Sequence, residues 1–272
     1  MLSDERDEGD AATAVWGEAM KLGKLPFCPD SRDLMLSRYA IHPHPRPALP
    51  AHPASFGHEK LVKVWGMLGN DELGDCVFAG AAHEVMLWTS EAGAMAGFSD
   101  AGVISDYSAV TGYDPTVPGS DQGTEVRAAL KFRSATGSVA ADGRRHKLSA
   151  YLGIQLGNLD QLQEATWLFS AVGVGIRFPT SAMKQFDKGQ PWDVVPRSKI
   201  EGGHYIPIMA FHDNLLWCVT WGKLQAMTPA FWLEYGDEAW ALLSHDYTVN
   251  ERSPEGYDFS TLLQDIAALK AA

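Results

Sequence analysis

The fold is decided by the stretch GNDELGDCVFAGAAH, which spans residues 69–83. It begins as a polar loop that contains Gly69 and Gly74, and glycine permits backbone conformations that other residues resist. After the loop, apolar residues recur at roughly helical spacing, which predicts a helix that begins at Cys76 and is buried on one side. Asp75 precedes this helix, and an aspartate there can cap a helix by accepting a backbone N–H.

Cys76 is thus expected where the unpaired N–H groups and the dipole of a helix favour negative charge. Such a position lowers the pKa of a thiol and produces the thiolate, which is the reactive form. Asp71, Glu72 and Asp75 surround the cysteine, and their charge opposes thiolate formation unless they point away. His83 lies two helical turns further on, and we interpret it as a helix packing residue.

Composition places the chain among globular proteins. Hydrophobic residues make up 46% and charged residues 21% of its 272 residues, which is enough apolar material for a sizeable core. The net charge is -12 and Lys and Arg form no cluster, so we expect no nucleic-acid partner. No apolar run is long enough for a membrane span, and the acidic residues 1–8 are unlike a secretory signal, so we expect a cytoplasmic protein.

The cysteines also indicate a reducing compartment. Cys28, Cys76 and Cys218 are odd in number and widely spaced, which argues against a disulfide framework and against paired zinc-ligand motifs. Cys28 lies in a proline-flanked loop. Cys218 lies in an apolar run and is expected to be a small buried hydrophobe. Only Cys76 has an environment suited to chemistry.

Three regions are expected along the chain: residues 1–58, 59–248 and 249–272. In the first, residues 1–24 form a weakly helical lead that packs on the body or on a partner, and residues 25–58 form an extended, proline-rich surface segment. This segment carries His42, His44, His52 and His58. A polyproline segment has no fold of its own to bring ligands together, so we expect no metal and no cofactor. The last region is a tail with a terminal helix.

Helices dominate the first half of residues 59–248, and strands dominate the second half. Helices are predicted from Cys76 to about residue 91, after residue 99, and over 124–136, 159–169, 181–186 and 228–235. Strands are predicted over 171–178, 204–211, 215–221 and 238–245, with a tight turn at 212–214. This order indicates an α+β protein with a helical lobe and an antiparallel β lobe.

Several of these features, in this order, resemble the papain-like cysteine peptidase superfamily. In that family a glutamine precedes a cysteine that opens the central helix, a histidine follows on a strand, and an asparagine then precedes Ser-Trp-Gly. Here Asn70 lies six residues before Cys76, His204 begins an apolar strand, and Val219-Thr220-Trp221-Gly222 aligns with the last motif. The resemblance covers roughly residues 60–248, and similar divergent domains are found in bacterial and phage reading frames.

The resemblance implies a papain-like fold in which Cys76 is the nucleophile and His204 is its base. The Asn70 side chain and the Cys76 N–H would donate to the oxyanion, although asparagine is one methylene shorter than glutamine. Val219 occupies the position of the family's asparagine and cannot orient an imidazole. Thr220 is the first candidate to replace it, but alternation along a strand points it to the other face unless a bulge intervenes. Asp213, in the preceding turn, is the weaker choice.

Two functions follow from this pattern. The first is a thiol hydrolase, a peptidase or amidase, that acts on a protein or peptide through an acyl-enzyme. The second is a catalytically weak or inactive papain-like scaffold that binds a protein or builds an assembly, for example a phage particle, with its N-terminal segment on the partner. The missing asparagine, the proline-rich lead and the many tryptophans favour the second. A metal enzyme has no matching ligand spacing and ranks below both.

Overall fold

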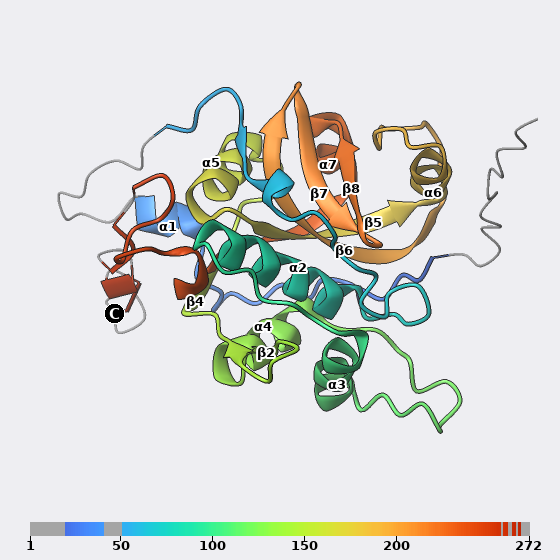
Figure 1. Cartoon of the computed structure of the whole chain (residues 1–272). Coiled ribbons are helices and arrows are strands. Elements are labelled where there is room, and N and C mark those ends of the chain that lie inside the picture. The colour runs from blue at the N-terminus through green and yellow to red at the C-terminus, as the bar shows by residue number, and fades with distance from the viewer. Residues whose placement is uncertain (1–19, 41–50, 257, 261–262, 265, 268–272) are drawn as a thin grey trace, which may run out of the picture.

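The computed structural model of the chain describes residues 20–40, 51–256, 258–260, 263–264 and 266–267. An antiparallel sheet packs on one side of the central helix α2 (Cys76–Glu91), and the helices α3 (Asp100–Thr111) and α4 (Val126–Ala135) pack on its other side (Figure 1). The expected α+β architecture is confirmed, with α2 between the helical lobe and the β lobe.

Helix α2 is buried on all sides, which corrects the expectation of one buried face. Every residue from Cys76 to Thr89 is buried. The reason is that β6 and β7 cover one side of the helix while α3 and α4 cover another. Small side chains let the sheet approach closely: a Cβ at Gly80 would lie 2.7 Å from Cδ1 of Tyr205. The helix therefore holds Cys76 on a rigid element.

The main sheet is antiparallel and has the strand order β4-β9-β5-β6-β7-β8, with β1 also paired to β6. The strands are β1 (Phe56–Gly57), β4 (Ala150–Gly153), β5 (Val172–Pro179), β6 (Ile200–His212), β7 (Leu215–Thr220), β8 (Lys223–Met227) and β9 (Gly236–Leu243). The turn between β6 and β7 has positive φ at Asp213 and Asn214, as tight hairpin turns require. Sequence patterns missed β4 and β8, because short strands give too few residues to show alternation.

The other elements lie around this framework. They are α1 (Leu36–Ala40), α5 (Leu159–Phe169), α6 (Thr180–Asp187), α7 (Pro229–Tyr235), the 3₁₀ turns η1 (Glu59–Leu61) and η2 (His245–Tyr247), and a small hairpin of β2 (Ser138–Val139) and β3 (Arg145–His146). Helices α5 and α7 also pack against the sheet, at β5 and β9. Among the residues that the structure describes, every helix is too short or too polar to span a bilayer.

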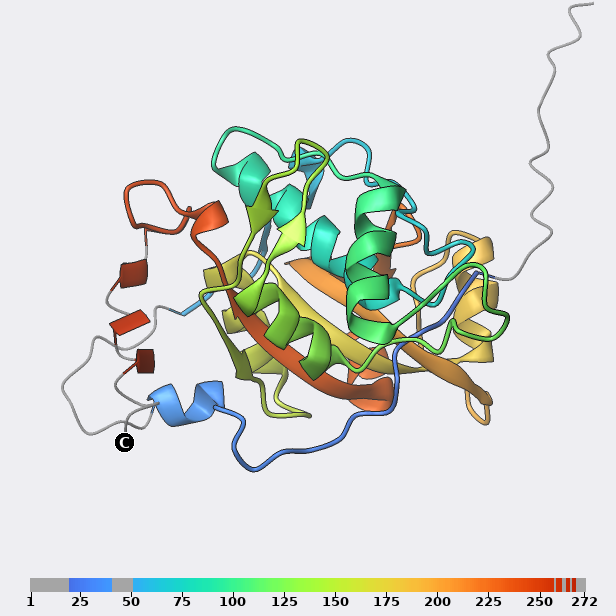
Figure 2. The same ribbon diagram turned by 90° about the horizontal axis from the view of Figure 1, so that it is seen from below.

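The N-terminal segment differs from its expected form. Residues 20–25 are extended rather than helical, and the blue trace in Figure 2 crosses the face of the molecule that is seen from below. In the described parts of the predicted extended segment, residues 25–40 and 51–58, most residues have no regular secondary structure, and the short helix α1 departs from the expectation. The rest of the predicted lead, residues 1–19, and His42 and His44 lie outside the described residues.

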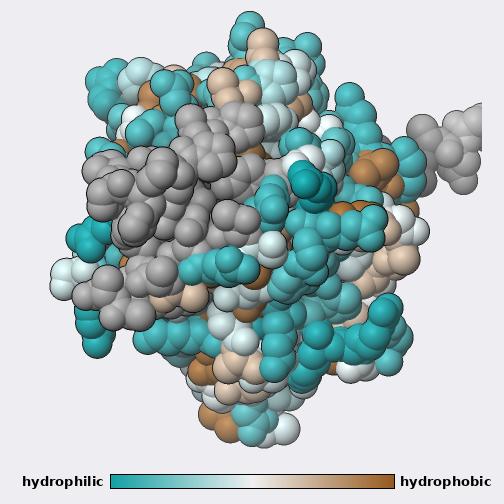
Figure 3. Space-filling view, turned by 90° about the vertical axis from the view of Figure 1, so that its left-hand side faces the viewer, coloured by the Kyte–Doolittle hydropathy of each residue, from teal (hydrophilic) through white to brown (hydrophobic). Residues whose placement is uncertain are grey.

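On the face shown in Figure 3, the coloured surface is mostly hydrophilic, and its apolar atoms form small separate groups. Exposed large apolar residues are spread along the chain, among them Val64, Val117 and Leu233. Scattered apolar side chains are normal on a protein surface and indicate no interface by themselves.

Candidate active site

The structure places Cys76 and His204 on neighbouring elements. Cys76 is the first residue of α2, His204 lies within β6, and these two elements pack against each other. Both side chains are almost completely buried. The backbone of Tyr205, the residue after His204, lies at the thiol of Cys76. The two residues that the sequence predicted as nucleophile and base thus lie on packed elements where the two lobes join.

One ring nitrogen of His204 is held by Thr220. Nε2 lies 2.7 Å from Oγ1 of Thr220, the last residue of β7. The imidazole also stacks on the indole of Trp221, with ring centroids 4.4 Å apart and an interplanar angle of 17°. Nδ1 is buried and has no hydrogen-bond partner among the described residues. When Nε2–H donates to the threonine, Nδ1 carries the lone pair that can accept a proton.

The strand geometry explains how Thr220 reaches the imidazole. The register between β6 and β7 shifts between Ile208 and Ala210, and β7 ends at Thr220, directly before Trp221 with a φ of 45°. Val219 is buried and pairs with Leu224 of β8. Asp213 is exposed, and its carboxylate pairs with Nδ1 of the adjacent His212. Of the two alternatives to an asparagine, the structure brings only Thr220 to His204.

Asn70 lies in the loop before α2 and is buried. Its Nδ2 donates to the Leu73 carbonyl at 3.0 Å and lies 3.5 Å from the carbonyl of Lys21. The indole N–H of Trp221 donates to the same Lys21 carbonyl at 3.2 Å. A backbone carbonyl is therefore accommodated between an amide on one lobe and an indole on the other.

Residues 21–25 fill the cleft above the cysteine. Lys24 N–H donates to the Gly203 carbonyl at 3.0 Å, and Leu25 N–H donates to the Thr124 carbonyl at 3.0 Å. Thr124 N–H in turn donates to the Gly23 carbonyl at 2.7 Å. The segment is thus bonded through its backbone to both lobes, and the Gly23 backbone lies at the Cys76 thiol. Residues 20–24, the described part of the predicted lead, pack on the body, and the Gly23 backbone lies against the candidate nucleophile.

Two glycines make this close approach possible. A Cβ on Gly23 would lie 1.8 Å from the carbonyl oxygen of Gly74, and a Cβ on Gly203 would lie 2.2 Å from the carbonyl oxygen of Lys24. Any larger residue at either position would push the segment out of the cleft, because the atoms that it meets belong to the backbone.

In the covered site, burial favours the uncharged forms of both Cys76 and His204. Burial raises the pKa of the Cys76 thiol to about 12, and the backbones of Tyr205 and Gly23 oppose this shift only in part. Burial likewise lowers the pKa of His204 to about 3. The sequence predicted a lowered thiol pKa at the start of a helix. That prediction is wrong for this closed arrangement, because desolvation by burial, together with the charge of Asp75, outweighs the helix dipole.

Asp75 does not cap α2. Its side chain accepts no helix N–H, and its carboxylate is buried. Burial and the nearby charge of Asp121 raise the pKa of Asp75 to about 8. Asp71 and Glu72 are exposed, so they do not crowd the thiol as the sequence allowed.

The remaining histidines and cysteines have packing or surface roles. His83 is buried, bonds to the Gly66 carbonyl at 3.1 Å and packs edge-on against Trp65, as a packing residue should. Cys218 is buried and donates its S–H to a carbonyl, whereas Cys28 is exposed. Within the described part of the chain, no group of three His, Cys, Asp or Glu side chains is arranged to hold a metal ion.

Sequence reasoning overlooked Lys24 and its partners Asp237 and Glu238, which lie beside the cleft. No local motif marks them, because the lysine lies far along the chain from the carboxylates that it meets. Trp221 was recognised only as part of a motif, and the structure adds its stacking on His204.

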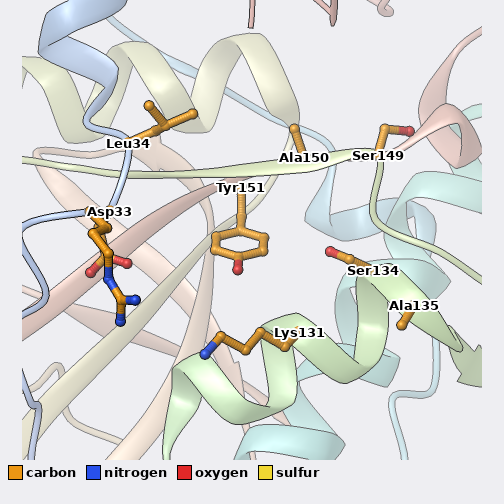
Figure 4. A pocket seen from close by; sticks show the side chains of 9 residues that line it. Asp33, Leu34, Lys131, Ser134, Ala135, Ser149, Ala150 and Tyr151 are labelled. Atoms are coloured by element: carbon orange, nitrogen blue, oxygen red, sulfur yellow. The ribbon is translucent and has the colours of Figure 1, made fainter. Parts of the chain in front are cut away.

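A separate cavity of about 600 Å³ lies between the segment before α1, helix α4 and strand β4. Tyr151 and Lys131 approach it from β4 and α4 (Figure 4). None of its lining residues belongs to the cleft that contains Cys76 and His204.

The fold is similar to that of solved cysteine proteases. Xylellain, a cysteine protease from Xylella fastidiosa, has a TM-score of 0.60 and 14% identity over 84% of this chain and 97% of that chain. The cysteine protease and lectin-like domains of Cwp84 from Clostridium difficile have a TM-score of 0.59 and 10% identity over 83% of this chain and 56% of that chain. Digestive procathepsin L2 from Tenebrio molitor larval midgut has a TM-score of 0.52 and 13% identity over 72% of this chain and 70% of that chain.

No family model and no curated protein matches the chain. At these identities the structural likeness concerns the fold. The chain has a papain-like fold, as the sequence predicted.

Proposed function

We propose that this protein is a thiol hydrolase, a peptidase or amidase, that uses Cys76 and His204 on a polypeptide substrate. The observation that carries the proposal is the segment of residues 21–25. It lies extended over Cys76 and is bonded through backbone groups to both lobes, so the cleft accepts an extended polypeptide chain next to a thiol.

The reaction requires that residues 21–25 first leave the cleft. Water then reaches the thiol and the imidazole, and the burial that raises the pKa of Cys76 and lowers that of His204 is relieved. The start of α2 favours the thiolate once desolvation no longer opposes it. The form of the protein in which residues 21–25 occupy the cleft would therefore be inactive until they leave.

In the open site, Nδ1 of His204 takes the proton of Cys76, and the sulfur attacks the substrate carbonyl carbon. The carbonyl oxygen becomes an oxyanion, to which the Cys76 N–H and the Asn70 amide donate. As the C–N bond breaks, His204 returns the proton to the leaving amine, and a thioester remains on Cys76. Water, activated by His204, then attacks the thioester and releases the acid and the thiol.

Thr220 is a positioning residue in this scheme. It accepts the Nε2–H of His204 and so leaves Nδ1 as the base. A hydroxyl, like the amide of an asparagine, is neutral and can orient the imidazole by accepting its N–H. The cytoplasm, where thiols stay reduced, suits such a nucleophile and is part of the proposal.

The test uses the full chain with Gly23→Val, which opens the cleft by the clash described above. Peptide mixtures are incubated with this variant, and new termini are identified by mass spectrometry. We expect cleavage that is absent from the same protein with Cys76→Ala or His204→Ala. Cys28→Ser is included throughout, since Cys28 is the exposed thiol.

Cleavage that persists in Cys76→Ala would remove this nucleophile from the scheme. The scaffold alternative is favoured by a different result: a folded, open variant that cleaves nothing and whose Cys76 is alkylated at the rate of a free thiol, unchanged by His204→Ala. The scaffold alternative rests on two observations: Val219 stands where an orienting asparagine is expected, and residues 21–25 fill the cleft.

A further inference from the structure

Lys24 is buried in a pocket beside the candidate nucleophile. Its side chain is 0% exposed. Nζ lies 2.9 Å from Oδ2 of Asp237, 3.0 Å from Oε1 of Glu238 and 3.0 Å from the carbonyl of Leu25. An ammonium group has three N–H donors, so these oxygens satisfy it completely. Two carboxylates around one buried cation form a site that recognises the charge of the side chain.

The walls of this pocket are shaped for a long side chain. A Cβ at Gly175 of β5 would lie 2.1 Å from Cε of Lys24 and 2.6 Å from Cγ of Glu238. A side chain at this position would thus overlap the lysine stem and the carboxylates where they now lie. Glu238 is itself fixed, because the indole N–H of Trp240 donates to its Oε2 at 2.8 Å.

The pocket opens directly beside the reacting groups. Lys24 follows Gly23, whose backbone lies at the Cys76 thiol, and Lys24 N–H donates to the carbonyl of Gly203, the neighbour of His204. A cavity of about 660 Å³ adjoins Lys24 and Asp237 and leaves space for a larger group. A chain that replaced residues 21–25 would present a side chain to the same two carboxylates.

Removal of Lys24 would leave these carboxylates without their cation. Glu238 is 3% exposed, and burial already disfavours its charged form, while the ammonium of Lys24 opposes that effect. Buried charges are tolerated only when they are paired. The empty pocket thus favours a basic group over an apolar or acidic one.

We propose that the pocket of Asp237, Glu238 and Gly175 is a specificity site for a lysine or arginine side chain of a polypeptide substrate, and that Lys24 occupies it in place of that substrate. The assignment of a substrate rests on the proposed hydrolase function. The pocket itself is defined by contacts that do not depend on catalysis.

Binding to the full chain tests this without catalysis. The protein carries Cys76→Ser, to prevent turnover, with Gly23→Val and Lys24→Gly, to open the cleft and empty the pocket. Calorimetry compares acetylated, amidated tetrapeptides that differ only in lysine, norleucine or glutamate at one position, scanned along the peptide. We expect the lysine peptide to bind about tenfold or more tightly than the norleucine peptide at one position, since each hydrogen bond to a charged group contributes appreciably.

Asp237→Asn with Glu238→Gln should abolish that preference, whereas Asp142→Asn, an exposed carboxylate elsewhere on the surface, should leave it unchanged. If the triple variant does not fold, Cys76→Ser with Lys24→Gly empties the pocket while residues 21–25 stay in the cleft, and butylammonium and butanol, which need only the pocket, then replace the lysine and norleucine peptides. Equal binding of lysine and norleucine peptides at every position, or no binding by folded protein, would overturn the specificity site.

Hydrolysis is measured separately with Cys76 present. Lysine-selective binding without hydrolysis leaves the pocket in place and rejects the hydrolase. Cleavage that depends on Cys76 but is indifferent to lysine rejects the pocket and retains the hydrolase.

Discussion

The hydroxyl of Tyr205 donates a hydrogen bond of 2.7 Å to Oε1 of Glu84, and this bond joins the strand that carries His204 to the helix that begins at Cys76. The other carboxylate oxygen of Glu84 lies 2.6 Å from Nη2 of Arg133 on α4. Glu84 and Arg133 are almost completely buried. Three elements therefore meet in one polar network, which links the helix that carries the thiol to the strand that carries the imidazole.

The first prediction concerns this network. Tyr205→Phe removes the donor and leaves Glu84 with Arg133 alone, so we expect the free energy of unfolding to fall by about 1–3 kcal/mol. Glu84→Ala leaves Arg133 as an unpaired buried charge and should cost about 3–5 kcal/mol. Urea unfolding followed by tryptophan fluorescence measures both. Tyr113→Phe, on a partly exposed ring, is the control and should change stability by less than about 0.5 kcal/mol.

The second prediction concerns the covering segment. Gly23→Val cannot be accommodated against the Gly74 carbonyl, so residues 21–25 should leave the cleft. In the Cys28→Ser background, alkylation of Cys76 by iodoacetamide near neutral pH should then be about tenfold or more faster, because water lowers the raised pKa of the thiol. Peptide mapping identifies the labelled cysteine.

Gly97→Val is the matched control for this experiment, since a Cβ at Gly97 meets no atom within 4 Å. It should leave the alkylation rate of Cys76 unchanged. Slow alkylation in a folded Gly23→Val protein would mean that the segment does not protect the thiol.

The third prediction concerns Thr220. Thr220→Val keeps the shape of the side chain but removes the oxygen at Nε2 of His204. In the opened protein we expect the His204-dependent part of Cys76 reactivity to fall about tenfold or more, and the histidine limb of its pH profile to shift. Thr220→Ser retains a hydroxyl and should restore both. If valine and serine behave alike, Thr220 does not orient the imidazole.

The sequence predicted much of this site because local chemistry marks it. The glycine-rich loop before Cys76 and the apolar strand after His204 are both local patterns. Helix α2 begins where it was predicted, and β6 covers the predicted strand but begins earlier, at Ile200, so His204 lies inside the strand and not at its start. Thr220 was named only as a substitute for a missing asparagine. Its reach to His204 depends on a register shift between β6 and β7 that no sequence period reveals.

The sequence could not predict that the Cys76 side chain is buried. A cysteine at the start of a helix favours the thiolate when water reaches it, but the pKa of Cys76 is raised because the thiol is buried, in contact with the Gly23 backbone. That contact joins segments far apart in the chain, and its only sequence signs are the small residues Gly23, Gly74 and Gly203. The same applies to Lys24, whose carboxylate partners lie on β9.

The fourth prediction uses Asp75, whose pKa is raised to about 8 by burial and by the charge of Asp121. The unfolded chain loses this proton near the usual aspartate value, whereas the folded chain keeps it to higher pH. Between these values the native state therefore binds more protons than the unfolded state, so the stability contributed at this position falls as the pH rises. Asp75→Asn removes the titration.

Urea unfolding at about pH 5 and about pH 8 measures the effect, and the difference between the two proteins isolates Asp75 from other titrating groups. We expect the unsubstituted protein to lose on the order of 1–4 kcal/mol more than Asp75→Asn over this range. Asp71→Asn, an exposed neighbour, should follow the unsubstituted protein. An Asp75→Asn protein that loses as much stability as the original would show that Asp75 is already ionised in the folded state, and a charge beside Cys76 would then have to be included in its reactivity.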